Sequence, residues 1–162
     1  MDYSDDPPTL PKRVIDVGLD GSPLKLVEIE GEYRPYTALT YCWGDDRDLA
    51  PVKLLLSRHA AYSKEIPIEL FPKTLLDAVT ITRRLGMQYL WIDALCILRD
   101  SPADWAIGSS RMSNIYTAAE VVIAATGAGG CKDGCFIGSR KKLRLPYTDD
   151  DGRERALYAR LA

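Results

Sequence analysis

The middle of the chain constrains the fold most, because a strand, a helix and a second strand follow one another directly. Residues 89–97 read YLWIDALCI, a nearly continuous apolar run typical of a buried central strand. The tetrapeptide SPAD at 101–104 predicts a helix start, with serine as N-cap, proline at the first position and aspartate completing a capping box. We expect this helix to end near Ala118 and a strand to follow at residues 120–125, EVVIAA. Such a unit indicates parallel strands joined by a crossover helix.

The preceding segments extend this unit into an α/β domain. Two short β-like runs, 13–17 and 24–29, predict a β-hairpin at the edge of the domain. Residues 36–43, YTALTYCW, predict a central strand, and residues 52–56 predict a further one. A helix is expected to begin in a capping box at Thr74 and to stop at Gly86. We therefore predict a mainly parallel central sheet with helices on its faces and an N-terminal β-hairpin.

The 162 residues are enough for one domain with extensions at both ends. Residues 1–12 are expected to be disordered or extended, residues 13–138 to form the domain, and residues 139–162 to form a polar C-terminal extension. Within that extension, residues 154–162 are expected to form a frayed helix. The acidic N-terminus has no apolar core, and no apolar run reaches the length of a membrane span. We expect a cytoplasmic protein with no membrane partner.

Charge and histidine content argue against several function classes. The net charge of −2 gives no basic excess, so nucleic acid is not expected as a partner. His59 is the one histidine, which rules out a multi-histidine metal site, and we expect it at the surface. Cys131 and Cys135 in CKDGC lack two further zinc ligands nearby. No metal is predicted, and the role of these two cysteines stays open.

Aromatic and polar residues gather at the predicted ends of strands, where open α/β sheets build their sites. Tyr41, Trp43 and Gly44 close the 36–43 strand. A nucleotide can stack on Trp43 or approach the backbone at Gly44. Packing at the core or the rim is the alternative for these residues.

The second junction contributes four residues: Asp93, Cys96, Asp100 and Trp105. Asp93 is either a catalytic acid or a hydrogen-bonded acid that fixes the turn. Cys96 is either a nucleophile or a buried thiol, and the absence of a nearby histidine favours the thiol. Arg111, in the following helix, either holds a phosphate or pairs with an acid such as Asp104.

Three ordered blocks carry a family resemblance: YTALTYCWG, FPKTLLDAVTITRRLGMQYLWIDALCI and DWAIGSSRMSNIYTAAEVVIAA. Together they resemble the fungal heterokaryon incompatibility (HET) domain over roughly residues 12–138. The resemblance implies a fungal protein of self/non-self recognition, programmed cell death and innate immunity. HET domains are in turn distantly similar to TIR domains. That similarity implies a flavodoxin-like three-layer α/β fold and, as in some TIR domains, cleavage of NAD at the nicotinamide glycosidic bond.

NAD-cleaving TIR domains carry a glutamate in a W-x-x-E pattern, and HET domains usually show D-W-x-x-E. Asp104 and Trp105 match this pattern, but the glutamate position is Gly108. Helical spacing places Gly108 on the same stripe as Trp105 and Ile115. Glycine inside a helix costs about 1 kcal/mol relative to alanine, and nothing in the pattern requires a positive φ there. We interpret Gly108 as a replacement for a catalytic glutamate and Asp93 as the best remaining acid.

The resemblance thus leads to two hypotheses about function. The first is a NAD glycohydrolase-like cell-death effector, weak or inactive because of Gly108, with NAD as substrate and no further cofactor. Its nucleotide pocket would include Tyr41, Trp43, Gly44, Cys96, Asp100, Trp105 and Arg111. The second is a non-catalytic signalling module that acts by homotypic self-association or by binding a partner.

Overall fold

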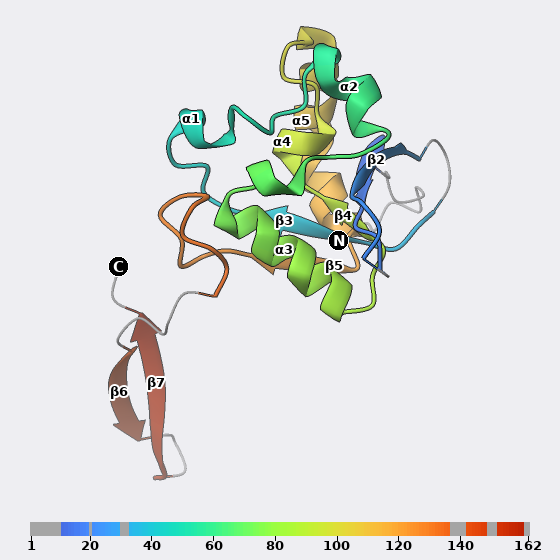
Figure 1. The fold of residues 1–162 in the computed structure, drawn as a ribbon. Helices are drawn as coiled ribbons and strands as arrows, with labels where there is room; N and C mark the ends of the chain where they lie inside the picture. The colour runs from blue at the N-terminus through green and yellow to red at the C-terminus, as the bar shows by residue number, and fades with distance from the viewer. Residues whose placement is uncertain (1–10, 20, 30–32, 137–141, 149–151, 161–162) are drawn as a thin grey trace.

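The computed structural model describes residues 11–19, 21–29, 33–136, 142–148 and 152–160. Five strands form the central sheet in the order β2-β1-β4-β3-β5 (Figure 1). They are β1 (Arg13–Asp16), β2 (Lys25–Glu28), β3 (Tyr36–Thr40), β4 (Tyr89–Trp91) and β5 (Val121–Ala124). The helices are α1 (Asp46–Leu49), α2 (Leu56–Tyr62), the 3-10 turn η1 (Ile68–Leu70), α3 (Lys73–Arg84), α4 (Asp93–Cys96) and α5 (Pro102–Ala118). Strands β6 (Lys142–Thr148) and β7 (Glu154–Arg160) form a second, two-stranded sheet.

The central sheet is mixed, so the prediction of a mainly parallel sheet is wrong. Strand β3 runs parallel to both β4 and β5, as the crossover unit predicts. Strand β1 runs antiparallel to β2 and also to β4, with Ile15 opposite Leu90. The N-terminal β-hairpin is therefore confirmed, and its β1 strand extends the sheet beside β4. With the β6–β7 pair included, three of the five pairings in the described residues are antiparallel.

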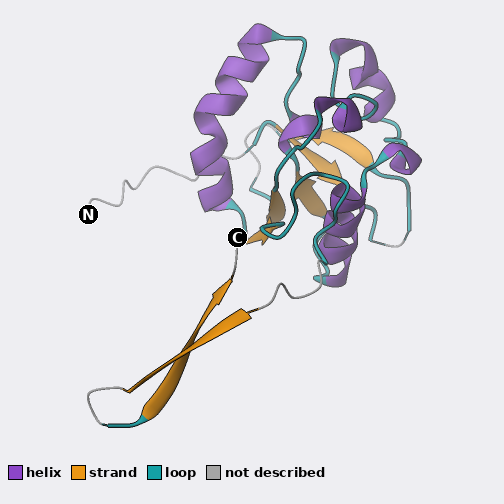
Figure 2. Ribbon diagram, turned by 90° about the vertical axis from the view of Figure 1, so that its left-hand side faces the viewer, coloured by secondary structure: helices purple, strands orange, loops and turns teal. Residues whose placement is uncertain are grey.

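Helices α3 and α5 cover opposite faces of this sheet. Adjacent residues of a strand point to opposite faces. The Tyr36 hydroxyl donates to the Ile115 carbonyl of α5 at 2.5 Å, whereas the Thr37 hydroxyl lies 2.7 Å from that of Thr82 in α3. Figure 2, turned by 90°, shows α5 along one side of the sheet. The α/β class is thus confirmed.

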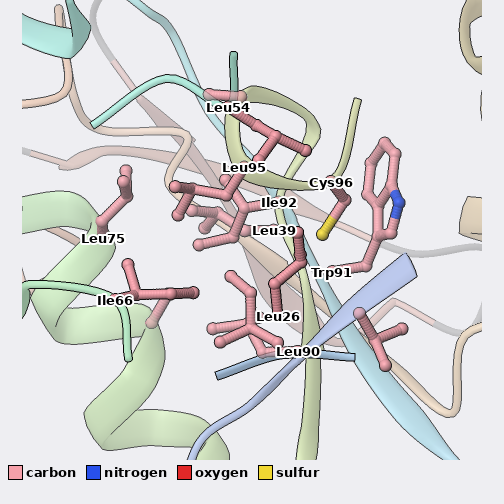
Figure 3. Close-up of a cluster of buried hydrophobic side chains, with 14 of the residues drawn as sticks. Leu26, Leu39, Leu54, Ile66, Leu75, Leu90, Trp91, Ile92, Leu95 and Cys96 are labelled. Atoms are coloured by element: carbon pink, nitrogen blue, oxygen red, sulfur yellow. The ribbon is translucent and has the colours of Figure 1, made fainter. Parts of the chain in front are cut away.

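The hydrophobic core lies between the sheet and the segments packed on it. Its largest fully buried side chains come from β1, β3, β4, α1, α3, α4 and the loops between them. Figure 3 labels Leu39, Leu54, Ile66, Leu75, Leu90, Trp91, Ile92 and Leu95 among them. Each such side chain contributes about 1.5–3 kcal/mol when fully buried. Trp91 also meets Tyr116 of α5 edge-on, with 5.4 Å between ring centroids.

Three predicted elements differ in the structure. Residues 52–56 form no strand. Leu54 instead bonds to α4 and the segment after it, donating to the Ala94 carbonyl at 2.9 Å and accepting from the Arg99 amide at 3.0 Å. Residues 154–160 form strand β7 rather than a frayed helix. The apolar 89–97 run splits into β4 and the short helix α4, whose turn is closed by the Cys96 amide donating to the Ile92 carbonyl at 2.9 Å.

The two predicted helices are present, and the predicted cap is found in α5 but not in α3. Ser101 caps α5 by accepting from the Asp104 amide at 3.3 Å, as predicted. Helix α3 begins at Lys73 without a side-chain cap, since the Thr74 hydroxyl accepts instead from the Gly134 amide at 3.0 Å. The predicted boundary at residue 138 and the tail 1–10 lie outside the described residues.

Candidate functional site

The parallel strands β3 and β4 end at the same edge of the sheet, and three of the predicted site residues meet there. Trp43 follows β3, Asp93 follows β4, and the Trp43 indole Nε1 donates to Asp93 Oδ2 at 3.1 Å. The Tyr41 hydroxyl lies close enough to influence the same carboxylate electrostatically. This edge, outside the carboxyl ends of parallel strands, is where open α/β sheets bind ligands.

Asp93 is a buried acid, with 8% of its surface exposed. Besides Trp43, it accepts from the Ala94 amide at 2.7 Å and from Arg99 Nη2 at 3.2 Å. Burial raises the pKa of Asp93 above its usual value, and Arg99 and these hydrogen bonds oppose that rise in part. The carboxyl group is therefore easier to protonate than an exposed aspartate.

Arg99 is a site residue that the sequence analysis missed. Its guanidinium carbon lies 4.4 Å from the centre of the Trp43 ring, and Lys53 Nζ lies 5.1 Å from the same centre. Both are within cation–π range. A base that stacks on Trp43 must therefore compete with at least one of these cations.

Two polar atoms in this region have no hydrogen-bond partner. In the part of the chain that the structure describes, the Tyr41 hydroxyl and Arg99 Nε are the buried side-chain polar atoms left unpaired. Burial, and after it the charge of Asp93, raises the pKa of Tyr41. Although Tyr41 and Asp93 are close, no hydrogen bond of normal geometry joins them, so we treat their contact as electrostatic. Unpaired buried polar groups are rare, and strain, a catalytic role or a bound water or ion accounts for them. We call Tyr41, Trp43, Asp93 and Arg99 the Asp93 cluster.

A second acidic cluster lies at the other end of α4. Arg13 is 2% exposed and donates to both Asp104 carboxylate oxygens, at 2.9 and 2.5 Å, and to the Cys96 carbonyl at 2.7 Å. The Leu98 amide also donates to Asp104, at 2.9 Å. The Asp104 carboxylate thus joins β1 to the start of α5 rather than capping its own helix. We call Arg13, Asp104 and these two backbone groups the Arg13 clamp.

Gly108 lies beside the Arg13 clamp and not in the Asp93 cluster. A β-carbon at this position would come within 2.8 to 3.0 Å of three side-chain atoms of Ile97. Gly108 has no positive φ, as the sequence predicts, but α5 approaches Ile97 too closely for a side chain without rearrangement, so packing favours glycine at this position. A cavity of about 30 Å³ lies here, lined among others by Arg13, Asp104, Gly108 and Arg111.

The other predicted site residues, Gly44, Asp100, Trp105 and Arg111, lie outside the Asp93 cluster. Gly44 has φ +70°, and a β-carbon there would lie 3.0 Å from the Gly130 α-carbon. Asp100 accepts from the Leu56 amide at 2.9 and 3.1 Å and so holds the start of α2. Trp105 is 50% exposed, and Arg111 is exposed.

Cys96 fits the buried-thiol alternative. Its side chain is buried, and burial raises the pKa of the thiol to about 12. A thiol with that pKa stays protonated at neutral pH and is a poor nucleophile.

The residues in or next to the two clusters that the sequence did not predict, Arg13, Lys53 and Arg99, are all basic. Arg99 and Lys53 have no local motif that could have placed them against Trp43. Arg13 had a weak signal, since it is a charged residue opening an apolar strand. Within the described ranges, no group of three or more potential metal ligands gathers, and no helix is long and apolar enough to cross a membrane.

The fold and these clusters describe an α/β domain with a polar site at the carboxyl edge of its parallel strands. The family model of the heterokaryon incompatibility protein (HET) matches residues 36–157. The chain therefore belongs to the HET family, which confirms the resemblance and implies an effector role in heterokaryon incompatibility. A search of curated proteins found no match, and a search of solved structures found none.

Proposed function

We propose that this HET domain binds NAD or a related nucleotide at the Asp93 cluster and cleaves it weakly or not at all. The observation that carries the proposal is the pair of unpaired buried atoms, Tyr41 hydroxyl and Arg99 Nε, beside a buried carboxylate. The similarity of HET domains to TIR domains, some of which cleave NAD, supports the choice of ligand.

The donor and acceptor properties of the cluster fit a ribose hydroxyl. Arg99 Nε can only donate, the Tyr41 hydroxyl can donate or accept, and the ionised Asp93 can only accept. A ligand hydroxyl accepts from Arg99 or Tyr41 and donates to Asp93, so it completes the set. A phosphate would meet the negative charge of Asp93.

Access to the cluster requires a side chain to move, because both unpaired atoms are sealed from solvent. Arg99 is the best candidate. Its side chain is 16% exposed and is held by the contact with Trp43 and one bond of 3.2 Å to Asp93. Displacing it would open the Trp43 face and Asp93 together.

We expect weak cleavage because Asp93 is the single carboxylate of its cluster, while position 108, beside the Arg13 clamp, supplies no second one. Loss of nicotinamide passes through an oxocarbenium-like state that a nearby carboxylate stabilises. Gly108 supplies none, and Asp104 is neutralised by Arg13. Asp93 can hold a hydroxyl, but its own charge is partly compensated by Arg99.

The non-catalytic alternative is favoured by one observation: Gly108 packs against Ile97, apart from the Asp93 cluster. In that case the domain acts by self-association or by binding a partner.

The test combines NAD binding with nicotinamide release, measured on the wild-type chain, Asp93→Asn and the exposed control Glu69→Gln. We expect saturable binding by the wild type and the control, binding at least tenfold weaker for Asp93→Asn, and no release above background. Equal binding by wild type and Asp93→Asn, or no binding at all, would overturn the proposed site. Rapid nicotinamide release by the wild type that Asp93→Asn abolishes would overturn the proposal of weak or absent cleavage.

A restored acid tests the role of position 108. Because the added side chain meets Ile97, Gly108→Glu is made alone and together with Ile97→Ala, and folding is checked by circular dichroism. If the missing carboxylate limits cleavage, the folded double variant releases nicotinamide faster than Ile97→Ala alone. An equal rate would assign the weak activity to another cause.

A further inference from the structure

The two outer strands of the central sheet differ in how they are protected. Strand β2 carries exposed Lys25 and Glu28, and Glu28 is bonded to His59 of α2 at 3.2 Å. Residue Ile66 also donates to the Leu24 carbonyl at 2.7 Å, next to this edge. Charges and a covering segment are the usual ways to block an edge strand.

Strand β5 has none of these protections in the described residues. It contains no charged residue and no proline, and Val122 is 42% exposed. Strand β3 pairs with one side of β5, and no described strand pairs with the other. An uncharged, open edge of this kind is a template for a further strand.

The β6–β7 hairpin of the same chain does not pair with the central sheet in the described residues. Strands β6 and β7 pair along all seven positions but, among the described residues, make no extensive contact with another helix or strand. Figures 1 and 2 both show the hairpin standing away from the domain. An isolated two-stranded hairpin is marginally stable in water, and a third strand is needed for independent stability.

We propose that the β6–β7 hairpin of one copy adds to the β5 edge of a second copy. Strand β7 is the strand that joins, because β6 contains Pro146, which cannot donate to a neighbouring strand. The central sheet then continues as β2-β1-β4-β3-β5 followed by the other copy's β7 and β6. The exchange closes as a dimer when it is reciprocal and grows as an open chain when it is not.

Charge favours a second copy as the occupant. The two hairpin strands hold four basic residues and one acidic residue, in a chain with 21 basic and 23 acidic residues, so the rest of the molecule is acidic. This inference does not depend on NAD binding.

The test is sedimentation velocity over a range of concentrations, with Val122→Lys to charge the β5 edge and Leu157→Pro to block β7. Ile107→Lys places the same charge on an exposed apolar residue of α5 and serves as the control. We expect concentration-dependent association of the wild type and the control, and association at least tenfold weaker in the other two variants. A wild type that stays monomeric, or association that Val122→Lys does not weaken, would overturn the proposal.

Hydrogen exchange separates a second copy from the chain's own hairpin. If a second copy covers β5, the amides of residues 121–124 become protected only as the concentration rises. Protection in the dilute wild-type monomer that Leu157→Pro removes would show that the hairpin folds back on its own domain, and would also overturn the proposal.

Discussion

The two ends of the short helix α4 lie beside two acidic clusters that differ in how completely their polar groups are paired. In the Arg13 clamp, the guanidinium and the Asp104 carboxylate meet each other and two backbone groups. In the Asp93 cluster, the Tyr41 hydroxyl and Arg99 Nε stay unpaired although both are buried. Buried polar groups that are fully hydrogen-bonded stabilise the fold. Buried groups without a partner cost free energy of folding, and they persist where a ligand can satisfy them. The comparison assigns the first cluster to the fold and the second to function.

The largest effect is expected at the Arg13 clamp. Arg13→Ala leaves the part-buried Asp104 without its main partner, and breaking such a pair costs about 3 kcal/mol of unfolding free energy. Urea denaturation measures this loss. Lys12→Ala is the control, since Lys12 is exposed and lies 3.9 Å from Asp104, so its loss should cost less than about 1 kcal/mol. If both variants lost the same free energy of unfolding, the Arg13 clamp would stabilise the fold no more than a surface ion pair does.

Gly108→Ala tests whether α5 needs a glycine next to the clamp. In an unconstrained helix this change stabilises by about 1 kcal/mol. Here the new methyl group lies within 3.0 Å of Ile97, so we expect a net destabilisation of about 1 kcal/mol. Ile97→Val, which removes one of the contacted atoms, should reduce the penalty in the double variant. A more stable Gly108→Ala would restore our interpretation of residue 108 from the sequence.

The packing of Gly108 against Ile97 shows what the sequence could and could not predict. The Ser101 cap, the α5 helix, the β5 strand and the N-terminal hairpin were all predicted, because caps, glycines and alternating apolar residues act locally. The sequence also placed Trp43 and Asp93 at adjoining strand ends. It could not show that Ile97 fills the space at residue 108, since that contact depends on how α4 and α5 pack.

Antiparallel pairing of β1 with β4 was missed for a similar reason. The run of residues 13–17 identifies a strand but not the neighbour that it chooses. Residues 94–97 are apolar because they are buried and not because they pair in a sheet. The apolar run 89–97 was therefore predicted as one strand. The basic partners Arg13 and Arg99 come from distant or irregular segments, and no spacing rule connects them to their acids.

Asp93 should make stability depend on pH in a defined direction. Its pKa in the folded state is raised by burial, so the folded protein binds the proton more tightly than the unfolded chain. Relative to Asp93→Asn, the wild type should therefore lose stability as pH rises from the unfolded pKa of about 4 through the folded pKa. Urea denaturation of both proteins at several pH values measures the difference. An opposite slope would mean that Arg99 dominates over burial.

The smallest effect concerns the cysteines and leaves stability unchanged. Cys42 is exposed, whereas Cys96 is buried and its thiol pKa is about 12. Under native conditions at neutral pH, an alkylating reagent should label Cys42 quickly and leave Cys96 unlabelled, as mass spectrometry can show. Rapid labelling of Cys96 would reopen its role as a nucleophile at the end of α4.

Tyr41→Phe tests the central contrast most directly, because it removes one unpaired atom and almost nothing else. If the Asp93 cluster is a ligand site, the variant should gain about 1 kcal/mol of unfolding free energy, since a buried unpaired hydroxyl is lost. Its affinity for NAD should fall by about tenfold, which corresponds to 1.4 kcal/mol. A variant that loses stability while binding NAD as tightly as the wild type would contradict the account.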